Sequence, residues 1–142
     1  MEKMLTLQEF YRTRLNFVPD TLKKGLGHFN VFKRADVALC RSGQALYSRK
    51  DYYKISLLKG KFRIQYADKV VVSQRNTLVF SNPMIPYSWE PLGEDEGGFF
   101  CLFTEEFFNQ YGQMREYPVF KPGYNKVYDV ADDKLEHIEN IF

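Results

Sequence analysis

The chain has 142 residues, of which 44% are hydrophobic and 17% aromatic, with two cysteines far apart, Cys40 and Cys101. That length supports one sizeable core, and the composition excludes a wholly disordered chain. No stretch approaches the roughly 18 consecutive apolar residues of a membrane span, and residues 1–4 lack the apolar region of a signal peptide. We therefore expect a cytoplasmic protein with reduced, incidental thiols and no membrane partner.

The formal net charge of +2 hides an asymmetry along the chain. Residues 1–75 contain 16 Lys/Arg and 6 Asp/Glu, whereas residues 76–142 contain 4 and 12. We expect the two halves to interleave and cancel; the alternative is that they form complementary faces that meet in a dimer. On either interpretation the chain is a poor candidate for binding DNA by itself.

The N-terminal region predicts a short helix. Thr6 and Glu9 have the spacing of a capping box, and Val18-Pro19-Asp20 ends the helical pattern. An apolar stripe lies between them, formed by Leu7, Phe10, Tyr11 and Leu15.

Residues 27–103 show the pattern of short strands. The predicted strands are 28–32, 52–58, 62–66, 70–72, 77–80, 87–90 and 99–103. Between them we expect tight turns at 59–61 and 67–69 and an acidic, glycine-containing loop at 94–98.

Two helices are predicted after the strands. Thr104 is the expected N-cap of the first, with Gly112 at its end, and the second begins near Asp129 or Asp132. Its apolar face consists of Leu135, Ile138 and Phe142. Because this pattern stops on an apolar residue, we expect the natural protein to continue; the alternative is a C-terminal helix that docks through its last residue.

Short strands with helices confined to the ends predict a mainly β fold, either a closed antiparallel barrel or a sandwich, with flanking short helices. The expected organisation is a helical segment at 1–26, a β domain at 27–103 and C-terminal helices at 104–142.

The sequence offers little for catalysis. His28 and His137 are the only histidines, and no HxH, HExxH or CxxC spacing occurs, so we expect no metal site. No nucleophile motif is present, and the acidic segment 93–98 would repel phosphates. We therefore expect neither an enzyme nor a cofactor.

Tyrosines and a tryptophan on the predicted strands lie among lysines and arginines, which is typical of a pocket for a small polar ligand. The alternative is that the rings pack the core, with their hydroxyls at its rim, while the cations form a solvated face.

Three stretches in fixed order carry a resemblance: residues 49–55, the segment Lys59-Gly60-Lys61, and residues 75–87, which end Ser81-Asn82-Pro83-Met84-Ile85-Pro86-Tyr87. Together they resemble the N-terminal cupin-like domain of the arabinose-regulator (AraC) family of bacterial transcription regulators. The resemblance implies an antiparallel β-barrel (double-stranded β-helix). The metal-ligand places of metal-binding cupins would fall on Ser48, Lys50, Lys54 and Tyr87. None of these is a His or Glu, so the implied barrel is metal-free.

The resemblance and the hydrophobic pattern differ on one strand. The resemblance turns Lys50, Tyr52 and Lys54 into the barrel, whereas the pattern places Tyr53, Ile55 and Leu57 inside and the lysines in water. Only one set can face the interior, and we adopt the former.

The resemblance implies an effector-sensing and dimerisation domain. It would bind a small polar effector (a sugar or an organic acid), form a homodimer, and contact DNA only through a C-terminal helix-turn-helix domain absent from this chain. The face formed by Leu135, Ile138 and Phe142 is the expected dimer or interdomain helix. The expected ligand-binding residues are Lys50, Tyr52, Lys54, Tyr66, Tyr87 and Trp89.

Two other functions stay open. One is a stand-alone metal-free cupin-like protein that binds a carbohydrate or another small ligand. The other is a cupin enzyme, which would need acid/base groups or metal ligands inside the barrel. A further possibility within the regulator interpretation is a domain that only dimerises.

Overall fold

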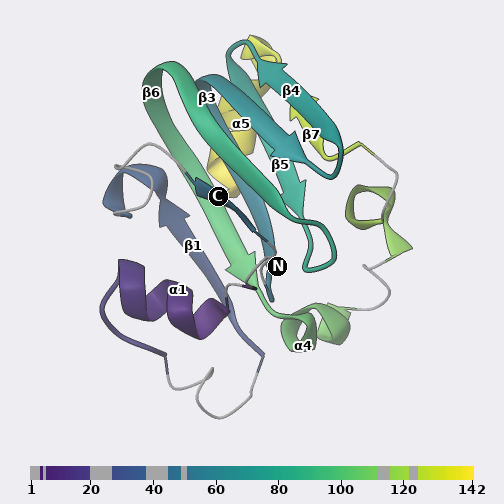
Figure 1. Ribbon diagram of the computed structural model, residues 1–142. Coiled ribbons are helices and arrows are strands. Elements are labelled where there is room, and N and C mark those ends of the chain that lie inside the picture. The colour runs from purple at the N-terminus through teal and green to yellow at the C-terminus, as the bar shows by residue number, and fades with distance from the viewer. Residues whose placement is uncertain are drawn as a thin grey trace.

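The computed structural model describes Met4 and residues 6–19, 27–37, 45–48, 51–111, 116–121 and 125–142. The protein is mainly β, and the described strands form an antiparallel sheet flanked by short helices (Figure 1). In chain order the elements are α1 (Leu7–Arg14), β1 (Phe29–Lys33), η1 (Arg34–Asp36), β2 (Ala45–Ser48), β3 (Tyr53–Tyr66), β4 (Lys69–Ser73), β5 (Asn76–Ser81), β6 (Tyr87–Phe103), α4 (Glu105–Phe108), η2 (Asn109–Tyr111), η4 (Pro118–Phe120), β7 (Val127–Asp129) and α5 (Asp132–Ile141).

Two long strands, β3 and β6, organise the sheet. They pair from Tyr53 opposite Phe103 to Tyr66 opposite Tyr87, and each takes part in two groups of strands. One end of the pair lies in the order β1-β6-β3-β5-β7, here called the five-strand half. The other end pairs with β2 and β4 and forms the four-strand half. Among the described strands no pairing joins β1 to β7, so the sheet is open, and the closed barrel stays a prediction.

The predictions of a turn at 59–61 and of a loop at 94–98 are wrong, because β3 continues through the first segment and β6 continues through the second. Gly60 (φ +123°) and Gly98 (φ +122°) adopt backbone conformations that favour glycine. The register between the two strands shifts on each side of Gly60. Such irregularities bend a strand without ending it. Their sequences contain the same residue types as turns, namely glycine and charged residues, and so resemble turns.

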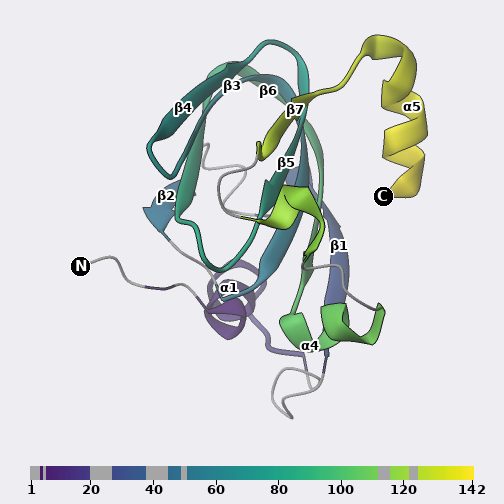
Figure 2. The same ribbon diagram turned by 90° about the vertical axis from the view of Figure 1, so that its right-hand side faces the viewer.

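The sheet curls (Figure 2), and one hydrophobic cluster draws on both of its halves. We call this cluster the inner core. Its buried residues are Leu7, Phe10, Tyr11, Val37, Tyr52, Leu58, Phe62, Ile64, Tyr66, Val79, Tyr87, Trp89, Phe100, Leu102 and Val127.

The even-numbered residues of β3 face the inner core, as the resemblance implied. Tyr52 and Leu58 belong to that core, and the Lys54 Nζ lies 4.6 Å from the centre of the Phe100 ring. The pattern-based expectation that Lys54 lies in water is wrong, since the residue is only 8% exposed. Between residues 53 and 59 the opposite face of β3 is also covered, so this part of the strand has no simple polar alternation, whereas residues 61–66 alternate between exposed and buried.

The second face of the sheet carries its own aromatic cluster. We call it the outer cluster: Tyr53, Cys101, Phe103, Phe108 and Phe120 are buried, and Val31, Ile55, Phe80, Phe107, Val119 and Phe142 pack against them.

The helices begin where local signals placed them. The Thr6 hydroxyl accepts a hydrogen bond from the Glu9 backbone N–H at 3.1 Å, and the carboxylate of Asp51 accepts one from the Leu7 N–H at 2.7 Å. The second contact ties α1 to the start of β3. Thr104 caps α4 by accepting from the Phe107 N–H at 3.3 Å. The predicted end of that helix, Gly112, lies outside the described residues.

Ion pairs connect the basic and the acidic half of the sequence in the described part of the chain. Each ion pair found there joins a cation from residues 1–75 to a carboxylate from residues 76–142, which is the predicted interleaving. The pairs are Arg34–Asp95, Lys59–Glu139, Arg63–Glu90 and Arg75–Asp132.

The bend in β6 makes a prediction about Gly98. A Cβ added there would lie 1.9 Å from the carbonyl oxygen of Leu57, on top of the unfavourable φ. We expect Gly98→Ala to lower the free energy of unfolding by at least about 2 kcal/mol in urea denaturation. The matched control is Gly93→Ala, where an added Cβ meets nothing within 4 Å and the change should stay within about 1 kcal/mol. Equal effects of the two substitutions would contradict this account of the bend.

Candidate functional site

The structure brings some of the predicted ligand-binding residues together and separates others. Tyr66 and Tyr87 are direct partners across β3 and β6, and Trp89 lies two pairs further along, opposite Ile64. Tyr52 and Lys54 lie near the other end of β3, in the five-strand half. Lys50 lies outside the described residues. The five described residues are all buried, at 8% exposure or less.

Tyr66 and Tyr87 line a small cavity between the two halves of the sheet. Its volume is about 10 Å³, which is about the space of one water molecule. The other residues that line it are Ile64, Val79, Phe80, Ser81, Asn82, Ile85 and Lys126. This cavity therefore has room for one water-sized group.

The polar groups around the cavity connect three segments. The Tyr66 hydroxyl donates to the side-chain oxygen of Asn125 at 3.2 Å and accepts from the Lys126 backbone N–H at 3.5 Å. Asn82 donates to the carbonyl of Phe120 at 2.7 Å and accepts from the Met84 N–H at 2.7 Å. The Tyr66 contacts hold the approach to β7 against the end of β3, and the Asn82–Phe120 contact holds the turn after β5 against η4. Both the amide nitrogen and the amide oxygen of the Asn82 side chain therefore have hydrogen-bond partners.

Lys126 is the residue at this cavity that the sequence did not indicate. Its side chain is 3% exposed, and its ammonium donates to the backbone carbonyl of Lys121. Burial, and then the charge of Lys69, lower the pKa of Lys126. Lys69 lies nearby, with its Nζ 5.9 Å from the centre of the Tyr66 ring. The available signal was the β-forming run after Lys126, from Val127 to Val130, which predicts a strand.

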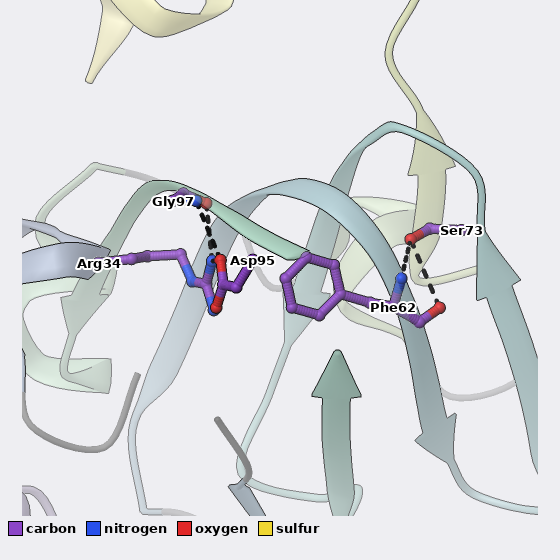
Figure 3. A network of polar contacts seen from close by, with 5 residues as sticks. All are labelled: Arg34, Phe62, Ser73, Asp95 and Gly97. Atoms are coloured by element: carbon purple, nitrogen blue, oxygen red, sulfur yellow. Dashed lines mark hydrogen bonds and ion pairs between the residues drawn. The ribbon is translucent and has the colours of Figure 1, made fainter. Parts of the chain in front are cut away.

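Trp89 does not line the cavity. Its ring lies beside the guanidinium of Arg34, whose contacts with Asp95 and Gly97 are drawn in Figure 3. The Arg34 Cζ lies 4.9 Å from the centre of the Trp89 ring and 5.1 Å from that of Phe62. The same guanidinium donates to both carboxylate oxygens of Asp95, at 2.6 and 2.9 Å, and to the carbonyl of Gly97 at 2.7 Å. Arg34 thus fills the place on Trp89 that a stacking ligand would need.

Tyr52 and Lys54 make contacts of their own in the inner core. The ring of Tyr52 lies 6.1 Å from that of Phe10. Burial, followed by the charges of Tyr87 and Asp51, raises the pKa of Tyr52 well above its ordinary value, so its hydroxyl is un-ionised at neutral pH. The Lys54 ammonium lies over Phe100, in a cation–π geometry.

The structure offers no candidate for metal or thiol chemistry within the described ranges. No group of three His, Cys, Asp or Glu side chains there is close enough to hold an ion. Burial raises the pKa of Cys101 to about 11, which makes its thiol a poor nucleophile. Cys40 lies outside the described residues.

A larger hollow lies over the outer cluster. It is a groove of about 300 Å³ with an apolar lining, which includes Ile55, Phe80 and Cys101 and the half-exposed Phe29 and Tyr117. Nearby, the predicted helix face of Leu135, Ile138 and Phe142 is only half-buried. Phe142 stacks on Phe99, with ring centres 5.9 Å apart. This side of the molecule therefore exposes more apolar surface than the cavity does.

Comparison with known proteins does not assign the chain to a family. No protein-family model matches the chain, and no curated protein matches it significantly. None of the described helices combines the length and the apolar composition needed to cross a bilayer.

His28 gives a pH prediction. Its Nε2 is 2.5 Å from the Tyr11 hydroxyl, and burial lowers the pKa of the imidazole. The folded state therefore favours the neutral imidazole of His28. The stability that depends on the neutral ring is fully present above the unfolded-state pKa of about 6.5, and it is lost as the pH falls below that value. We expect the urea midpoint to drop between pH 7.5 and 5.5, and to drop less in His28→Gln.

The control for this titration is His137→Gln, because His137 is exposed on α5. This variant should keep the pH dependence of the parent protein. A His28→Gln protein whose midpoint falls as steeply as that of the parent would show that another group is responsible.

Proposed function

We propose that this chain is the effector-sensing and dimerisation domain of an AraC-type bacterial transcription regulator, and that its sheet corresponds to the metal-free cupin-like barrel of that family. The observation that carries the proposal is the cavity inside the curled sheet, where Tyr66, Tyr87 and Lys126 meet. The ordered stretches at 49–55, 59–61 and 75–87 support the family assignment.

The cavity is the place where an effector would bind. A pocket of apolar ring faces with a few polar tips suits a small polar molecule. Because the volume is about that of one water, a larger effector has to displace neighbouring side chains, such as the partly buried Ile85. Ile85 lies in the turn between β5 and β6, next to the exposed Met84. Effector binding would therefore be coupled to the position of this turn.

A sensor domain must also pass its state to a partner. The half-covered face of Leu135, Ile138 and Phe142 on α5 is the proposed dimer or interdomain surface. An effector alters the arrangement of such partners only if it binds the two arrangements with different affinity. DNA would be read by a helix-turn-helix domain outside this chain.

A second candidate is a domain that only dimerises. It is favoured by the contrast between a cavity of about 10 Å³ inside the sheet and an apolar groove of about 300 Å³ outside it. In that case the inner core is purely structural.

A thermal-unfolding panel separates the two candidates. The purified chain is heated with sugars and with organic acids, each in large excess. A ligand at 100 times its Kd adds about 2.7 kcal/mol, which raises the Tm by several degrees for a domain of this size. The effector proposal expects at least one class to do so, and expects Tyr66→Phe to reduce the shift. If no compound in either class shifts the Tm, the sensing proposal fails and the dimerisation-only function takes its place.

A further inference from the structure

Lys126 is a buried cation that lacks a counter-charge in the described part of the chain. Its side chain is 3% exposed, and its ammonium donates to a neutral backbone carbonyl, that of Lys121. The ion pairs found among the described residues do not include it. Burying a charge is costly unless an opposite charge or several hydrogen bonds compensate it. An ammonium ion has three donors, so this site has capacity for a further acceptor.

A second cation lies beside the same tyrosine. The Lys69 Nζ is 5.9 Å from the centre of the Tyr66 ring, while the Lys126 backbone N–H donates to the hydroxyl of that ring. The charge of Lys69 adds to burial in lowering the pKa of Lys126. The charge of Lys69 therefore disfavours the charged form of Lys126 in the ligand-free protein, and an anion bound at the Lys126 ammonium would offset that repulsion.

The cavity beside Lys126 fits one small group. Its volume of about 10 Å³ admits an atom group the size of a water molecule, such as one oxygen of a carboxylate. The rings of Tyr66 and Tyr87 and the side chain of Ile64 give it mostly apolar walls. Phe80 and Ile85, which also line it, are only partly buried and leave a side from which a ligand can extend. A neutral sugar would need several hydrogen-bonding groups and more space.

We propose that Lys126 is the anion-recognising residue of the inner cavity, and that the effector is an organic acid whose carboxylate lies against its ammonium. This inference rests on the proposed function, because it assumes that the cavity is the effector site. It adds the chemical class of the effector and the residue that selects it. It also gives a reason for the buried charge of Lys126 beside the cavity, because that charge is compensated when the effector binds.

The test compares carboxylates with uncharged analogues. Acetate, butyrate and benzoate are titrated against the chain by calorimetry and thermal unfolding, beside acetamide, butyramide and benzamide at the same ionic strength. We expect at least one carboxylate to raise the Tm and its amide to leave it unchanged. In Lys126→Met and Lys126→Gln the Kd for that carboxylate should rise at least tenfold.

Two controls make the result specific. Lys134→Met removes the same charge from an exposed position on α5 and should bind the carboxylate like the parent protein. Without ligand, Lys126→Met should unfold at the same Tm as the parent or a higher one, because it removes an uncompensated buried charge. Lys126→Gln keeps a donor for the Lys121 carbonyl and therefore serves if the Met variant does not fold.

The failures of the two proposals are distinguishable. If sugars raise the Tm while carboxylates do not, the cavity function stands and the acid specificity is overturned. Equal binding of an acid and its amide overturns it too, as does unchanged carboxylate affinity in both Lys126 variants. If neither sugars nor acids bind, the proposed sensing function fails together with this inference.

Discussion

The guanidinium of Arg34, which lies over the adjoining rings of Phe62 and Trp89, fixes the place where the sheet bends. Phe62 follows the irregular step of β3 at Gly60, and Asp95, which binds the guanidinium through both oxygens, lies in the bent part of β6. Arg34 is 2% exposed, so its charge would be costly without this partner. Bidentate geometry, a third hydrogen bond and two aromatic faces compensate that cost. One side chain from η1 thereby connects both long strands at their bends.

The curl of the sheet produces the candidate site. Flat strands would leave the Tyr66–Tyr87 pair facing away from β5, whereas the bend brings these rings to the same cavity as Val79 and Ser81. The chain then returns through β7, which places Lys126 beside them. The cavity is thus made of segments that are distant in sequence, and its contents depend on the bends that Arg34 holds. The same bends keep an aromatic outer cluster on the opposite face.

Local signals predicted much of the fold, and contacts distant in sequence decided the rest. The caps at Thr6 and Thr104 were readable because each acts within three residues. The segments at 59–61 and 94–98 were mistaken for a turn and a loop, because a bulged strand and a turn use the same glycines and charges. Trp89 was expected to bind a ligand because it lies on a strand near several cationic residues. Its contact with Arg34, which is distant in sequence, could not be predicted from that pattern. The run at 127–130 predicts a strand, but nothing local indicates that Lys126, directly before it, is buried.

The proposal that this domain serves a DNA-binding regulator is tested most directly by the gene that encodes it. The measurement is the sequence of the reading frame downstream of the codon for Phe142. We expect the frame to continue into two helix-turn-helix patterns with basic recognition helices. A stop codon directly after Phe142 would contradict the regulator claim and would leave a stand-alone ligand-binding or dimerising domain.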